Sequence, residues 1–120
     1  IEARVNWDTD NVPKGTVEGG FIPNLHITSK VTNEKTGLST FIDLVTHINL
    51  IDNFHYARNI SLPGAIGDLY SVEFNVTPPT KIELALHNDW VKMYGEKLFN
   101  GSTFSYSGVN FEEIAKANRN

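Results

Sequence analysis

The chain contains no cysteine, and this absence excludes several kinds of site. Disulfide bonds, thiolate metal sites, iron–sulfur clusters and a cysteine nucleophile are all ruled out. Positive charge is also scarce, because 10 Lys and Arg stand against 14 Asp and Glu and the net charge is −4. The charge balance therefore gives no support to binding of nucleic acid or of an anionic membrane surface.

Long apolar runs are missing as well. Each apolar stretch is a few residues long, whereas a helix that spans a bilayer needs about 20, so we expect no direct membrane insertion. The chain starts with Ile1 and has no charged-then-apolar leader, which we interpret as a processed or trimmed chain. With 120 residues, 40% hydrophobic and 20% charged, the composition predicts one globular domain over residues 1–120.

Apolar and polar residues alternate with a period of two in several segments. Such alternation is typical of antiparallel strands that bury one face and expose the other. Turn sequences such as Leu62-Pro63-Gly64 and Pro78-Pro79 separate these segments. The pattern predicts an all-β antiparallel sandwich. The predicted strands lie within residues 1–8, 25–31, 41–48, 69–76 and 81–86.

Helical signals are confined to the C-terminal end. Asn110 followed by Glu113 resembles a capping box before residues 114–117, which predicts a short C-terminal helix. The glycine-rich stretch at residues 64–68 leads into a predicted strand and not a helix, so it is not expected to bind phosphate.

The histidines are the strongest candidates for chemistry. His47 ends one predicted strand and His55 opens the next, and a hairpin would bring the two imidazoles close together. His87 follows the predicted strand at residues 81–86 and should point away from the core. If these strand ends meet at one rim of the sandwich, three imidazoles converge on one metal ion. The alternative, which the residues alone favour, is a set of unrelated surface histidines.

Two further polar residues have simpler interpretations. His26 lies on the polar face of a middle strand, where an ordinary solvent-exposed or interface histidine is expected. Glu2 lies on the wetter face of the first predicted strand and, taken alone, is a solvated carboxylate.

Three motifs occur in a characteristic order. A Phe-x-Pro-x-Leu strand opening at residues 21–25 precedes an Asn-x-x-Thr-Gly turn at 33–37 and a His-Tyr-x-x-Asn-Ile segment at 55–60. In this combination the chain resembles the periplasmic ferrous-iron transport accessory proteins, the FetP-like copper-binding iron-uptake proteins encoded beside high-affinity iron permeases. The resemblance covers residues 18–89.

This resemblance implies an immunoglobulin-like β-sandwich in the periplasm that forms homodimers, with copper near the dimer interface and a membrane iron permease as partner. It also implies metal ligands: His55 in the His-Tyr segment, His87 in a His-x-Asp setting, and Glu2 in the first strand. A methionine ligand of the family is absent, and its position falls on or next to His47, which we interpret as a replacement ligand. A further family histidine would fall just before Ile1.

The replacement changes the expected metal preference. Thioether sulfur favours Cu(I), whereas three imidazoles and a carboxylate favour Cu(II), with zinc close behind and iron weaker. Protonated imidazole cannot bind metal, so such a site should lose its ion as the pH falls through the histidine range. The sequence thus predicts a non-catalytic metal-binding accessory protein of iron uptake. It leaves open whether the protein delivers metal or assists iron redox chemistry.

Two other functions remain open. An immunoglobulin-like interaction module without metal needs only strands and turns, and Phe41 and Phe54, if clustered, would form its contact patch. A small redox or hydrolytic metalloenzyme would need an open coordination position and a substrate cleft, and no cleft is indicated. A catalytic role is therefore not favoured.

Overall fold

The computed structural model describes residues 1–51 and 53–117. Strands dominate these residues, every strand pair is antiparallel, and the predicted all-β class is confirmed. The elements in chain order are β1 (Glu2–Ala3), β2 (His26–Asn33), β3 (Ser39–Asn49), β4 (Asn53–Ala57), β5 (Tyr70–Thr77), α1 (Asn88–Tyr94), β6 (Ser102–Val109) and α2 (Phe111–Lys116).

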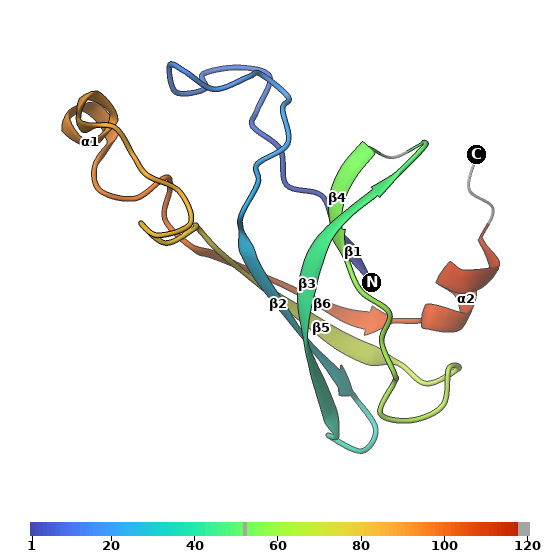
Figure 1. Cartoon of the computed structure of the whole chain (residues 1–120). Helices are drawn as coiled ribbons and strands as arrows, with labels where there is room; N and C mark the ends of the chain where they lie inside the picture. The colour runs from blue at the N-terminus through green and yellow to red at the C-terminus, as the bar shows by residue number, and fades with distance from the viewer. Residues whose placement is uncertain (52, 118–120) are drawn as a thin grey trace.

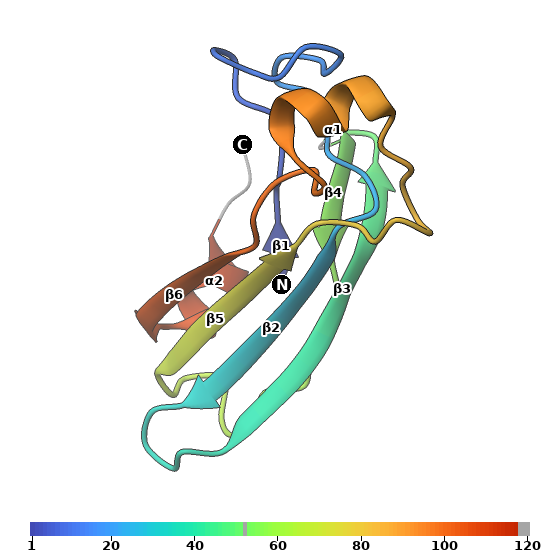
Figure 2. The same cartoon turned by 90° about the vertical axis from the view of Figure 1, so that its left-hand side faces the viewer.

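The strands form one curled sheet in the order β1-β4-β3-β2-β5-β6. The long strand β3 serves both halves of it: its first part, up to Leu44, pairs with β2, and its second part, from Val45, pairs with β4. The sheet therefore has a β2-β5-β6 half and a β1-β4 half that diverge from each other (Figures 1 and 2).

The core lies between these two halves. Alternation along β2 points Ile27 and Val31 inward, and both are almost fully buried. Tyr56 of β4 and Val76 of β5 pack with Ile27 in one cluster of this core, whereas Val31 belongs to a second cluster with Tyr70 and Val72. Residues 1–8 keep the predicted alternation, because their odd-numbered side chains pack on this core, but only Glu2–Ala3 form a strand.

The predicted strand at residues 81–86 is wrong. This segment turns instead, with Glu83 N and Leu84 N both donating to Thr80 O, and Ile82 is 99% exposed. The physical reason is that β5 already has β2 and β6 as its two neighbours, so no free edge remains beside it. Two elements were not predicted, namely α1 and β6.

The C-terminal helix was predicted correctly. Helix α2 begins after Asn110, whose side-chain oxygen accepts a hydrogen bond from Glu113 N at 3.1 Å. An amide side chain in this position satisfies one of the backbone donors that the first turn of a helix leaves free.

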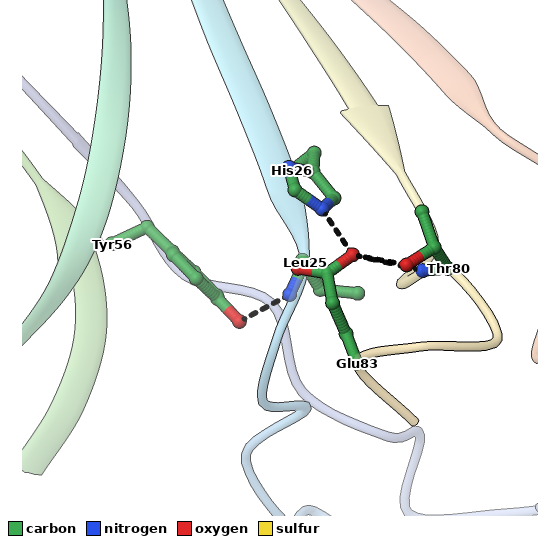
Figure 3. A network of polar contacts seen from close by, with 5 residues as sticks. All are labelled: Leu25, His26, Tyr56, Thr80 and Glu83. Carbon is green, nitrogen blue, oxygen red and sulfur yellow. Dashed lines mark hydrogen bonds and ion pairs between the residues drawn. The ribbon is translucent and has the colours of Figure 1, made fainter. Parts of the chain in front are cut away.

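Tyr56 fastens β4 to the segment that leads into β2. Its hydroxyl accepts a hydrogen bond from Leu25 N (Figure 3). The same hydroxyl donates to Ile22 O, and Tyr56 is 1% exposed. Burial raises the pKa of the Tyr56 hydroxyl above its ordinary value, so it keeps its proton. The bonded ring fixes β4, and with it the neighbouring residue His55.

His26 connects β2 to the turn that follows β5. Its Nε2 lies 2.6 Å from Glu83 Oε1, and the same carboxylate accepts from the backbone N and the hydroxyl of Thr80 (Figure 3). The hydrogen bond from His26, followed by those from Thr80, lowers the pKa of Glu83 from 4.5 to about 2. His26 is therefore partnered and holds the turn that follows β5.

Replacing Tyr56 with Phe should destabilise the fold by about 1–3 kcal/mol, because Ile22 O and Leu25 N lose their partner in a buried position. Urea unfolding measures this. The matched control is Tyr94→Phe, in which the lost hydroxyl accepts from Lys14 N at an exposed site, and its effect should stay within about 0.5 kcal/mol. Equal destabilisation by the two variants would contradict this assignment.

The carboxyl of Glu83 should titrate in the folded protein near pH 2, well below its ordinary value of 4.5. A lowered folded-state pKa stabilises the fold fully above pH 4.5, and this contribution disappears as the pH falls to about 2. The carboxyl chemical shift in an NMR pH titration measures the midpoint. His26→Ala should move the midpoint upward, and an unchanged midpoint would show that the His26 bond is not its main cause.

Candidate metal centre

The outer face of the β1-β4-β3 part of the sheet carries one candidate ligand on each strand. Glu2 lies on β1, His55 on β4 and His47 on β3. Glu2 lies opposite Ala57 of β4, and His47 lies opposite His55 of β4. Ala57 and His55 are two residues apart on β4, so they face the same side of the sheet. Because cross-strand neighbours share a face, the three side chains line one surface.

His47 and His55 form a directly opposed cross-strand pair. Their ring centroids are 5.7 Å apart, which confirms the predicted approach of the two imidazoles in a hairpin. Their surroundings differ, because His55 is 1% exposed and His47 lies at the exposed surface.

The orientation of the His55 ring is fixed at one nitrogen. Its Nδ1 lies 3.1 Å from the backbone oxygen of Asn53. A carbonyl only accepts, so this contact is a hydrogen bond in the form of His55 that carries its proton on Nδ1, and in that form the Nε2 lone pair is available to a metal. Asn53 was not predicted as a functional residue, although an asparagine at the start of a strand after a hairpin turn is a signal for unusual backbone geometry.

The free nitrogen of His55 faces a carboxylate. Its Nε2 lies 3.9 Å from Glu2 Oε1, and the Glu2 side chain is 32% exposed. Two ligands at about 2.0–2.2 Å from one ion can be separated by up to about 4 Å, so one ion fits between these atoms. The donor types fit a first-row transition metal.

The three candidate residues border a cavity of about 450 Å³. Val45 and Ala57 contribute apolar side chains to its lining, and Arg58, whose guanidinium donates to Asp43 O, lines it as well. The complete lining is Ile1, Glu2, Val45, His47, Asn49, His55, Ala57, Arg58 and Asn59.

His87 does not join this cavity. It caps the N-terminus of α1 rather than ending a strand, because Val91 N donates to His87 O and starts the helix. Its side chain is 86% exposed, and its Nδ1 lies 3.2 Å from Asp89 Oδ1. Figure 1 shows α1 on the opposite side of the molecule from the β3–β4 hairpin. Within a single protomer, His87 therefore does not meet His47 and His55 at one rim.

One protomer therefore brings only three of the four candidate residues to the cavity. Among residues 1–51 and 53–117, no group of three or more His, Cys, Asp or Glu side chains is arranged to hold a metal ion. The sole methionine, Met93, lies in α1 and so offers no thioether to the cavity.

The predicted aromatic patch does not form. Phe54 stacks on Phe21 with ring centroids 5.5 Å apart, whereas Phe41 lies under the Lys30 ammonium group. Phe54 is paired with Ile48, which is seven residues beyond Phe41 on β3, a distance of about 23 Å along a strand. The two rings thus belong to different surfaces.

In the part of the chain that the structure describes, neither helix has the length and apolar character needed to cross a bilayer.

Solved structures share this fold. A copper-bound variant of Campylobacter jejuni P19 has a TM-score of 0.72 and 27% identity, over 88% of this chain and 68% of its own. Copper-reconstituted P19 from the same organism has a TM-score of 0.70 and 26% identity, over 88% of this chain and 68% of its own. FetP of uropathogenic Escherichia coli F11, recombinantly expressed in the periplasm of a laboratory strain, has a TM-score of 0.69 and 24% identity, over 89% of this chain and 68% of its own.

No curated protein matches the sequence. The family described as Fe2+ transport protein matches residues 1–112, nearly the whole chain. The chain, with its curled antiparallel sheet and the opposed histidines of its β3–β4 hairpin, therefore belongs to the family of Fe2+ transport proteins.

Proposed function

We propose that this protein binds copper on the outer face of β1, β4 and β3 and acts as a periplasmic accessory protein of iron uptake beside an iron permease. The observation that carries the proposal is the opposed pair His47 and His55, with Glu2 3.9 Å from the free nitrogen of His55. Family membership and the copper-bound P19 structures support the choice of metal and process. The FetP neighbour, expressed in the periplasm, supports the compartment.

The ligand types favour Cu(II) over Cu(I). Imidazole and carboxylate are harder donors than thioether, and the chain has no methionine at the cavity. His47 supplies a second nitrogen directly opposite His55, in keeping with its interpretation as a replacement ligand. Zinc is the nearest competitor, and iron binds such donors more weakly.

Because one protomer brings only three of the four candidate ligands to the cavity, we infer that the protein forms a homodimer. Metal sites of this kind use three or four protein ligands, and His87 is an exposed imidazole that its own protomer cannot bring to the cavity. In a dimer, His87 of the second protomer supplies the missing nitrogen. The hairpin beside the cavity supports a contact there, because its apolar residues are exposed: Ile48 by 64%, Leu50 by 103% and Ile51 by 89%. Such a patch marks an interaction surface.

His55→Ala should weaken Cu(II) binding by at least roughly 100-fold, since changes to groups that only support a metal ligand already cost about 10- to 100-fold. Isothermal titration with a competing chelator measures the affinity. The matched control is His26→Ala, which removes an imidazole that is bonded to Glu83 outside the cavity and should leave copper affinity unchanged. Undiminished binding by His55→Ala would reject the assignment.

His55→Ala and His87→Ala should each lose copper binding alone and regain part of it when the two are mixed and allowed to exchange subunits. A mixed dimer has one site with both histidines intact and one site that lacks both. Copper stoichiometry and light scattering measure the two effects together. If mixing restores no binding although the mixed dimer forms, His87 is not a ligand supplied across the dimer.

A further inference from the structure

We propose that Asn53 is a positioning residue: its backbone carbonyl, held in place by a left-handed backbone conformation, fixes the ring of His55 with Nε2 as the metal-binding nitrogen. The part of this inference that concerns metal affinity rests on the proposed function. The part that concerns the His55 ring does not, because it is a property of the metal-free protein.

The hydrogen bond between the two residues selects one form of the imidazole. Asn53 O lies 3.1 Å from His55 Nδ1, and the ring is 1% exposed, so bulk water does not compete for this nitrogen. An oxygen that only accepts requires the proton on Nδ1. The lone pair is then left on Nε2, which is the nitrogen that faces Glu2 Oε1 at 3.9 Å.

The backbone at Asn53 is what makes this bond possible. In a regular strand the carbonyls lie in the plane of the sheet and side chains stand out of it, so a side chain does not meet the carbonyl two residues earlier. Asn53 departs from that geometry with a φ of 58°, at the point where the chain leaves the hairpin and enters β4. The departure brings its carbonyl within reach of the His55 ring.

Asparagine is suited to this position. It adopts left-handed backbone angles several times more often than most residues, glycine adopts them freely, and a β-branched residue resists them strongly. The last register pair of the hairpin, Asn49↔Asn53, anchors the same end, and Asn49 Oδ1 also accepts from Ile51 N at 3.0 Å. The strand pair and this side-chain bond thus order the β3 side of the connection, opposite Asn53.

The test compares Asn53→Gly with Asn53→Val. Both remove the amide side chain, but only glycine accepts the left-handed angle, so the pair separates the backbone effect from the loss of the amide. Two-bond 1H–15N NMR on metal-free protein at pH 8 reports the His55 tautomer. We expect the Nδ1–H form in wild type and in Asn53→Gly, and a mixture with the Nε2–H form in Asn53→Val. Copper affinity should stay near wild type in Asn53→Gly and fall roughly 10- to 100-fold in Asn53→Val.

Two results would overturn the proposal: a wild-type tautomer in Asn53→Val, or a changed tautomer in Asn53→Gly. Should the valine variant not fold, Asn53→Ala takes its place, with a shift in the same direction expected. If the tautomer changes as expected while no variant and no wild-type protein binds copper, the positioning role stands and the proposed function fails.

Discussion

The register of the β3–β4 hairpin is the constraint on which the candidate metal centre depends. It sets His47 opposite His55 and, through the pairing of β4 with β1, places Glu2 beside them. Side chains alternate between faces along a strand, so a slip of one residue in either pairing would send one ligand to the opposite face of the sheet. Within one protomer, three neighbouring strands supply the proposed ligands, and only His87 of a second protomer would come from outside the sheet.

Burial of Tyr56 in the core stabilises this register. Tyr56 and His55 are consecutive residues, so when the Tyr56 ring enters the core, the His55 ring must face the outer cavity. The bonds from Tyr56 to the segment at Ile22 and Leu25 make the inward orientation specific. The position of His55 thus follows from the burial of Tyr56. The same two residues therefore link the stability of the fold to the geometry of the proposed centre.

Several features could be predicted from the sequence because their causes are local. Strict alternation predicted β2, β3 and β5, the Asn110 and Glu113 pattern predicted α2, and the spacing of His47 and His55 predicted their approach across a hairpin. The segment at residues 81–86 shows where local pattern fails. It alternates like a strand, but a strand also needs a free neighbouring edge, and the sheet offers none beside β5.

His87 marks the boundary between what the sequence determined and what the tertiary structure decided. The sequence by itself determined the antiparallel all-β class, the ordinary charge balance, the exclusion of thiolate chemistry and the pairing of two imidazoles, because these depend on composition or on contacts close along the chain. Only the tertiary structure decided that Glu2 comes to His55, since these residues are far apart in sequence, and that α1, which His87 starts, lies away from the cavity. A periodic pattern tells which face of an element a residue occupies, but the packing of the whole chain decides what that face meets.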